Sequence, residues 1–268
     1  MTSQFACRFA CVAVLSLGLQ GATLEDSATP RRTIQTSAHR GEHLKHPENS
    51  LQSIQASIDA GIDFVELDVR TTADGHLVLM HDATVNRMTN GKGPVTKMTL
   101  AEIKRLDLGA RFPGKFPDCR IPTFDEALAL AKGRIGIYVD TKDATPKALV
   151  EIIDRHGMGS SVMFWSESVP FLKSILAVRP QWVVMPEAFD PAHVRMLLEQ
   201  LHPKVIGYDE RDFNAPTVDA ATKAGAGVFV DRQTENEWAE AIRMGATGIQ
   251  TDHPVELAAY LRARGYHR

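Results

Sequence analysis

The sequence predicts an α/β protein, a (β/α)8 or TIM barrel with a small insertion after its second strand. Short apolar segments alternate with stretches of helical periodicity, a pattern typical of βαβ units. Eight such segments can be placed within 268 residues, a length that suits one barrel domain. One long polar stretch interrupts the alternation early in the chain. An open, doubly wound sheet is the alternative, because alternation alone does not show whether the sheet closes.

The N-terminal residues predict a secretory signal peptide. Arg8 precedes an apolar run over residues 9–19, and the small residues Gly21 and Ala22 follow it. The run is shorter than the roughly 20 apolar residues of a membrane span, so stable membrane insertion is not expected. We therefore expect a signal peptide over residues 1–22, a polar linker over residues 23–33, and export to the periplasm or the medium.

The barrel is expected to occupy residues 34–268. Its predicted strands are residues 37–39, 64–69, 135–139, 162–165, 182–185, 205–208, 227–230 and 247–250. Helical periodicity appears between them, and the predicted helices include residues 51–60, 145–156, 191–201, 216–224 and 235–244.

Residues 77–80 are apolar but do not fit a barrel strand. The turn-like residues 71–75 that precede them are too few for a crossover helix, so residues 77–80 predict the return arm of a β-hairpin. Residues 82–122 follow and are rich in Gly, Pro, Thr and Lys, with one short predicted helix over residues 99–106. We expect residues 82–122 to form an inserted subdomain over one rim of the barrel.

The charge of the chain argues against nucleic acid as its partner. The formal net charge is -3 and 7% of the residues are aromatic, whereas nucleic-acid-binding domains are usually basic. A small anionic ligand is still compatible with this charge, because net charge does not describe the field inside one pocket. We expect a small-molecule substrate. The oligomeric state does not follow from the sequence.

Polar residues end most of the predicted strands, where the active site of such a barrel lies. These residues are His39, Arg40, Glu66, Asp68, Asp140, Lys142, Glu187, Asp209, Asp231 and Asp252.

Glu66 and Asp68 are the first candidates for a metal site. They are two residues apart on a strand, so their carboxylates point to the same face and repel each other. A hard divalent cation, Mg²⁺ or Ca²⁺, would relieve this repulsion, and Asp140 could supply a third carboxylate. Zinc is disfavoured because the sequence has no cluster of histidine and cysteine with zinc spacing. The alternative is that the pair caps the next turn or binds Arg70.

Two histidines complete the set of groups that phosphodiester cleavage needs. His39 ends the first strand and His81 ends the hairpin arm, so both can reach the same barrel mouth. The reaction needs a base, an acid and neutralisation of the phosphoryl oxygens. Arg40 can grip a phosphate with its guanidinium fork, and Lys142 can add a positive charge. The alternatives are a salt bridge from Arg40 to a nearby glutamate and a solvated loop position for Lys142.

The motifs around these residues resemble the glycerophosphodiester phosphodiesterase family, and the resemblance runs from Ala38 through Pro254. The matching segments are His39-Arg-Gly41 with Pro47-Glu-Asn-Ser50, Val65-Glu-Leu-Asp-Val69, Leu79-Met-His-Asp82 with Arg87, Thr89, Asn90, Gly91 and Gly93, then Leu100, Leu106, Asp107, Gly109, Ile121-Pro-Thr-Phe124 and Thr251-Asp-His-Pro254.

The resemblance implies a (β/α)8 barrel with a bound Mg²⁺ or Ca²⁺ that hydrolyses glycerophosphodiesters to sn-glycerol 3-phosphate and an alcohol. It implies that His39 and His81 are the acid and base pair, and we assign the acid role to His81. Two departures from the family pattern stand out: Asp140 replaces a glutamate, and no tryptophan accompanies Asp231. The alternatives are a phosphodiesterase that forms a cyclic phosphate, as in sphingomyelinase D or phosphatidylinositol phospholipases, and a non-catalytic barrel that binds a phosphorylated ligand.

Overall fold

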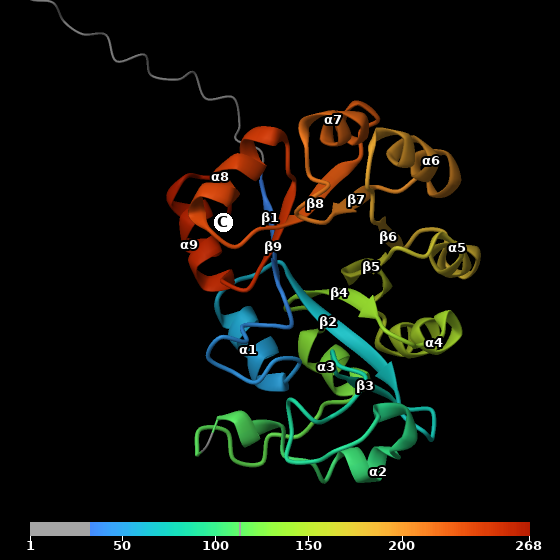
Figure 1. Ribbon diagram of the computed structural model, residues 1–268, viewed down its shortest axis with the longest axis vertical. Helices are drawn as coiled ribbons and strands as arrows, with labels where there is room; N and C mark the ends of the chain where they lie inside the picture. Colours follow the sequence, from blue (N-terminus) through green and yellow to red (C-terminus); the bar gives the residue numbers. More distant parts are fainter. Residues whose placement is uncertain (1–32, 113) are drawn as a thin grey trace, which may run out of the picture. The chain divides into compact units, whose positions relative to one another are not determined.

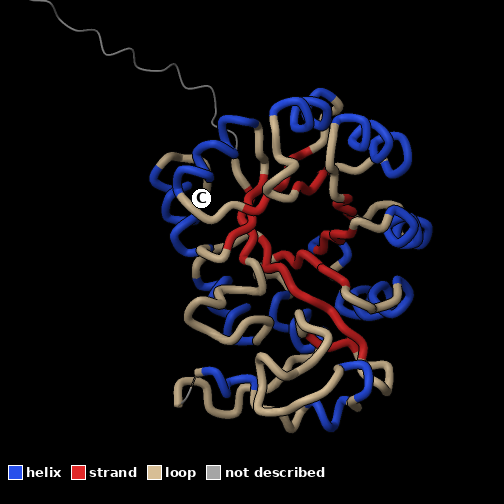
Figure 2. The backbone as a smooth tube through the Cα atoms, viewed as in Figure 1, coloured by secondary structure: helices blue, strands red, loops and turns tan. Residues whose placement is uncertain are grey.

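The computed structural model describes residues 33–112 and 114–268 (Figure 1). Within them, eight parallel strands form a nearly closed barrel with helices around the outside (Figure 2). The predicted signal peptide over residues 1–22 and most of the predicted linker lie outside the described residues. No helix in the described part of the chain has the length and apolar character that crossing a membrane requires.

The order of the strands confirms the predicted barrel. Neighbours run β6-β5-β4-β2-β1-β9-β8-β7, so the first and last barrel strands pair with each other. Between β6 and β7 there is a single bridge, Glu187 to Gly207, with a hydrogen bond of 3.0 Å from Ala188 N to Gly207 O. The open, doubly wound sheet is therefore wrong. The strands are β1 (Gln35–Ala38), β2 (Phe64–Thr71), β4 (Gly136–Thr141), β5 (Val162–Ser166), β6 (Val183–Pro186), β7 (Val205–Tyr208), β8 (Gly227–Asp231) and β9 (Gly248–Thr251).

Helices follow the strands around the outside of the barrel (Figure 1). Most begin at a Ser, Thr, Asp or Asn whose side chain accepts a backbone N–H of the first turn, as Ser50 does for α1. α3, α5 and α9 add to the helices expected from periodicity. The α-helices are α1 (Leu51–Asp59), α3 (Phe124–Ala131), α4 (Pro146–His156), α5 (Val169–Val178), α6 (Pro191–Leu201), α7 (Ala215–Lys223), α8 (Glu235–Met244) and α9 (Pro254–Ala263), with a short 3-10 helix η3 (Gly159–Ser161) before β5.

The alternation of side chains along β2 separates the core from the site. Val65, Leu67 and Val69 pack in the main core between the sheet and the helices. Glu66 and Asp68 alternate with them and therefore point into the barrel. A separate cluster of mostly aromatic and sulfur-containing side chains fills the barrel interior. It consists of Tyr138, Met163, Met185, Val205 and Phe229, with Phe64 and Trp165 against them.

The insertion begins with the predicted hairpin. β3 (Leu77–Leu79) pairs antiparallel with the end of β2, which runs two residues longer than expected. The residues that follow have their own small core, built on Val78, Met80, Ile103 and Ile121. They lie beside β2, β3 and α3 (Figure 1). The helices here are η1 (Val95–Lys97), α2 (Leu100–Ile103), which is shorter than the predicted residues 99–106, and η2 (Leu108–Arg111).

Asp63 ties β1 to β2 at the end of the barrel opposite the strand ends that carry the site. Its Oδ2 accepts the Thr36 backbone N–H at 2.8 Å and the Thr36 hydroxyl at 3.1 Å. Asp63→Ala leaves the buried Thr36 N–H unsatisfied, so we expect the free energy of unfolding to fall by about 1–3 kcal/mol. Urea denaturation measures this loss. The exposed Glu199→Ala is the control, with an expected change within about 0.5 kcal/mol; equal losses in the two variants would contradict the assignment.

Candidate active site

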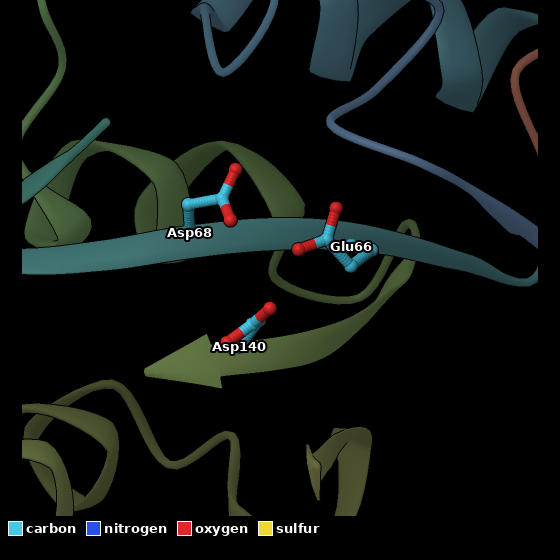
Figure 3. Close-up of side chains that lie close together, drawn as sticks. All are labelled: Glu66, Asp68 and Asp140. Carbon is cyan, nitrogen blue, oxygen red and sulfur yellow. The ribbon is translucent and has the colours of Figure 1, made fainter. Parts of the chain in front are cut away.

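Three carboxylates from two neighbouring strands meet at the mouth of the barrel. Asp68 of β2 and Asp140 of β4 are partners in the parallel ladder, and Glu66 lies one inward position earlier. Each of the three offers an oxygen that lies within 4.8 Å of the other two. Figure 3 shows the three carboxylates close together, with Glu66 and Asp68 on one strand and Asp140 on the other. The register of β2 and β4 therefore creates the cluster.

Burial makes this cluster electrostatically costly. Glu66 is 2% and Asp68 1% exposed. Desolvation and the charge of Asp68 raise the pKa of Glu66 well above its usual range. Desolvation also raises the pKa of Asp140, although Lys142 opposes the shift. Such a set of oxygen donors fits a hard divalent cation, which would satisfy the negative charge that burial disfavours.

The loop after β1 holds two of the carboxylates through unusual backbone angles. Arg40 and Asn49 have positive φ values of 55° and 54°. The Arg40 backbone N–H donates to Glu66 Oε2 at 2.8 Å. The Asn49 side chain donates to Asp68 Oδ2 at 2.6 Å and accepts the Asp68 N–H at 3.0 Å. Strained backbone of this kind is typical of functional sites.

Lys142 lies inside the carboxylate cluster. Its Nζ is 3.0 Å from Asp68 Oδ1 and 2.7 Å from Asp140 Oδ2. Burial lowers the pKa of this lysine, but the two carboxylates outweigh burial and the pKa is raised. The ammonium therefore stays charged beside the carboxylates. A solvated loop position, the alternative considered from the sequence, is wrong.

Arg40 brings a positive charge to the same cluster. Its Nε is 3.6 Å from Asp68 Oδ2, and one terminal nitrogen is 3.5 Å from Glu48 Oε1. Among the buried side-chain nitrogen and oxygen atoms of the described residues, Arg40 Nε is one of two without a hydrogen-bond partner. An unsatisfied buried N–H beside a lysine favours an anionic ligand at this position.

Neither Glu66 nor Asp68 binds Arg70, so the alternative that these two carboxylates pair with Arg70 is wrong. Arg70 donates to Asp143 at 2.9 Å and, through Nε and a terminal nitrogen, to the His81 carbonyl at 3.1 and 2.7 Å. This arginine anchors the backbone of the second histidine to β2.

His39 is held on the barrel side of the cluster. The β1–β9 pairing brings Asp252 beside it, and His39 Nδ1 is 2.7 Å from Asp252 Oδ1. Burial lowers the pKa of the imidazole, but the Asp252 hydrogen bond and the charge of Glu66 outweigh burial and raise the pKa to about 9. The bond at Nδ1 leaves Nε2 as the nitrogen available for chemistry.

His81 approaches from the insertion side. It lies two residues after the end of β3, and its Nδ1 is 2.9 Å from Asp82 Oδ1. The charge of His81 acts on Asp140, whereas that of His39 acts on Glu66. His39 therefore acts on one member of the carboxylate cluster, Glu66, and His81 on another, Asp140. Each imidazole also has an aspartate partner on Nδ1, outside the cluster.

A cavity of about 190 Å³ opens beside His39 and extends into the barrel mouth. Trp165, Tyr208 and Glu187 line it, as do Asp209 and Asp231, whereas His81 does not. Burial and the nearby Glu167 and Asp209 raise the pKa of Glu187 to about 7, and a hydrogen bond from Trp165 opposes the shift. The cavity suits a ligand with hydroxyl groups and a small apolar surface.

The structure brings the seven residues to which the sequence assigns catalytic, phosphate-binding or metal-binding roles to one end of the barrel, and it adds partners to which the sequence assigns no role. Asp252 is one of the strand-end acids, and its signal is the Thr-Asp-His-Pro motif. Asn49 and Glu48 belong to the Pro-Glu-Asn-Ser motif, which flanks the first histidine. Asp82 and Arg87 lie in the motif of the second.

Comparisons with known proteins identify the family to which this chain belongs. The model of the glycerophosphoryl diester phosphodiesterase family matches residues 39–256. A glycerophosphodiester phosphodiesterase of Caldanaerobacter subterraneus is 34% identical, with 85% of this chain and 98% of that protein covered. One from Bacillus subtilis is 29% identical, with 92% and 95% covered.

Solved structures show the same fold. A glycerophosphodiester phosphodiesterase from Agrobacterium tumefaciens is 28% identical with a TM-score of 0.76, covering 85% of this chain and 100% of that one. An Oleispira antarctica phosphodiesterase in complex with the product sn-glycerol-3-phosphate is 26% identical with a TM-score of 0.78, covering 86% and 97%. This chain therefore belongs to the glycerophosphoryl diester phosphodiesterase family of enzymes.

Proposed function

We propose that this enzyme hydrolyses glycerophosphodiesters to sn-glycerol 3-phosphate and an alcohol, using a divalent cation and two histidines. The observation that carries the proposal is the group of three carboxylates flanked by two imidazoles, each with a carboxylate on Nδ1. The family membership and the printed product of the Oleispira relative support the same reaction. Export, proposed from residues 1–22 alone, would bring the enzyme to diesters outside the cytoplasm.

Glu66, Asp68 and Asp140 would hold the cation. Carboxylate oxygens are the ligands that Mg²⁺ and Ca²⁺ prefer. Burial, and after it the charge of Asp68, raises the pKa of both Glu66 and Asp140, so a cation at this position would relieve an unfavourable cluster. When bound, such an ion polarises the phosphoryl oxygens and neutralises charge in the transition state. Arg40 binds the phosphate through Nε, which has no hydrogen-bond partner in the described residues, and Lys142 adds a second positive charge.

The histidines move the protons. Asp252 holds a proton on His39 Nδ1, so Nε2 can accept one from the attacking hydroxyl or water. The pKa of about 9 applies to the cation-free site, where the charge of Glu66 contributes to it. A cation bound to Glu66 would neutralise its charge, which would lower the pKa of His39 and favour the free imidazole that a base requires. Asp82 orients His81 in the same way, and His81 then donates a proton to the leaving alkoxide.

The position of the cavity suggests how the substrate lies. It adjoins His39 and not His81. The base and the acid act on opposite sides of the phosphorus in an in-line displacement, so the group beside His39 stays with the phosphate. We therefore assign the cavity to the glycerol moiety, with Glu187 accepting from its hydroxyls. The alcohol leaves past His81, whose side chain is 36% exposed.

Removal of the cation is the first test. Chelation is expected to abolish glycerol 3-phosphate release from glycerophosphocholine, and added Mg²⁺ or Ca²⁺ to restore it. Glu66→Gln and Asp68→Asn should lose cation binding in calorimetry and lower turnover at least about 100-fold, since a ligand and its charge are removed. Asp118→Asn, with a side chain that is 92% exposed, is the control. Unchanged turnover in protein shown by elemental analysis to be metal-free would refute the proposal. Cyclic phosphate as the final product would favour the cyclising alternative.

The His39–Asp252 pair predicts a specific pH dependence. Asp252→Asn removes a cause of the raised pKa, so the pKa of His39 in cation-free protein should fall from about 9 toward 6.5. A raised histidine pKa stabilises the fold below about pH 6.5, and this stabilisation is lost as the pH rises through about 9. Asp252→Asn should therefore flatten the pH dependence of stability in this window and lower kcat at least about tenfold.

An NMR titration of the imidazole signals measures these values, with the exposed His76 as an internal reference. An unchanged pKa of His39 in Asp252→Asn would show that the pair has no electrostatic effect. Urea denaturation between pH 6 and 10 checks the stability profile separately.

The orientation of the substrate is tested with several leaving alcohols. Glu187→Ala removes a hydrogen bond to the glycerol moiety, so KM should rise about tenfold for choline, ethanolamine and serine diesters alike. The exposed Glu210→Ala, on the loop after β7, is the matched control. If the loss in Glu187→Ala instead depended strongly on the alcohol, the cavity would hold the leaving group.

A further inference from the structure

Arg87 of the insertion connects the second histidine to the loop after β1. Its Nε and one terminal nitrogen donate to both oxygens of Asp82, at 2.8 and 2.9 Å. Its two terminal nitrogens also donate to both oxygens of Glu48, at 2.9 and 2.6 Å. A guanidinium that grips two carboxylates in this way fixes the orientation of both.

The Asp82 carboxylate transmits this constraint to His81. Asp82 Oδ1 accepts from Arg87 and also lies 2.9 Å from His81 Nδ1. The Arg87 hydrogen bonds hold the pKa of Asp82 well below its usual range, so this carboxylate stays charged. An ionised Asp82 keeps a proton on His81 Nδ1 and leaves Nε2 facing away from the pair. Arg70 holds only the backbone of His81, so the ring depends on Asp82.

The other end of the bridge is the loop that shapes the phosphate site. Glu48 is 8% exposed and lies 3.5 Å from a terminal nitrogen of Arg40. The next residue, Asn49, holds Asp68. Arg87 therefore links the His81 ring, which belongs to the insertion, to the loop that carries Arg40 and supports a predicted metal ligand.

Direct contact of Arg87 with the substrate would conflict with its hydrogen bonds. Its five N–H groups face the four carboxylate oxygens of Asp82 and Glu48 and, at 3.0 Å, the sulfur of Met88. None is left for a phosphate or an alcohol unless a carboxylate is released, and the low exposure of Glu48 makes this costly.

We propose that Arg87 is a positioning residue, which acts through Asp82 to set the tautomer and direction of His81 relative to the phosphate site. This inference rests on the proposed function, in which His81 protonates the leaving alcohol. Loss of Arg87 should then impair proton donation and leave substrate binding nearly intact.

The kinetic test compares two leaving groups. With glycerophosphocholine, Arg87→Ala should lower kcat about 10- to 100-fold, with KM changed less than about twofold, and His81→Ala about 100-fold or more. With a p-nitrophenyl diester of glycerol 3-phosphate, the leaving group needs no proton. The kcat of both variants should then be close to that of the unmodified enzyme. Arg87→Lys should resemble Arg87→Ala, because an ammonium cannot make two forks. Equal losses on both substrates, or a raised KM, would overturn the proposal.

Arg120→Ala is the matched control, because Arg120 is also in the insertion but pairs with the exposed Asp118. It should leave kcat unchanged on both substrates. A double-mutant cycle tests whether Arg87 acts through Asp82 and not through a general loss of stability. Asp82→Asn should lower kcat as much as Arg87→Ala does, and the double variant should lose no more activity than either single variant. Additive losses would mean that Arg87 does not act through Asp82.

A spectroscopic measurement separates this inference from the proposed function. At a pH where the imidazole is neutral, the ¹⁵N shifts of His81 should report a single tautomer with the proton on Nδ1 in the unmodified enzyme and a mixture in Arg87→Lys. An unchanged tautomer would overturn the role of Arg87 even if hydrolysis were confirmed. A changed tautomer in a protein that hydrolyses no glycerophosphodiester would leave Arg87 as the positioning residue of a different reaction.

Discussion

The crowding of three carboxylates at the end of β2 and β4 is the constraint on which the rest of the site depends. In a barrel mouth that excludes most water, Glu66 and Asp68 repel each other and Asp140. The fold offsets this cost locally with the Asn49 amide and the ammonium of Lys142. These contacts do not make the cluster a good structural element, because a well-packed apolar set would be at least as stable. The arrangement is explained by the divalent cation that we propose these carboxylates hold.

The barrel and the insertion make different contributions to this site. His39 is fixed by the sheet itself, since the β1–β9 pairing places Asp252 next to it. His81 lies on a hairpin arm outside the barrel wall, and long side chains replace the sheet in holding it: Arg70 on its carbonyl and Arg87 through Asp82. In the proposed orientation, the barrel binds the glycerol moiety common to all substrates. The insertion side then accommodates an alcohol that varies.

Local patterns in the sequence were sufficient for the fold class and for placing the candidate residues at one end of the barrel, but not for their contacts. The two-residue spacing of Glu66 and Asp68 on an apolar strand predicted their common face, and the short turn at residues 71–75 predicted the hairpin. The pairing of His39 with Asp252 joins residues 213 positions apart, so it depends on barrel closure and on strand register. The alternation of elements predicted the eight strands, but it left an open sheet as an alternative and did not give the register, so both closure and register come from the structure. The fork of Arg87 depends on how an irregular insertion packs, and no periodicity describes that.

Asp140 illustrates why one methylene matters at this position. An aspartate carboxylate stays closer to its own strand than a glutamate carboxylate would, and Lys142, two residues further along, reaches both Asp140 and Asp68. A cation held by the same carboxylates would compete with the ammonium for Asp68 Oδ1 and Asp140 Oδ2, since two positive charges this close repel each other. The ammonium would then be free to turn toward a bound phosphate. In this arrangement, one lysine stabilises the cluster without a cation, and it would serve as a phosphate ligand with one.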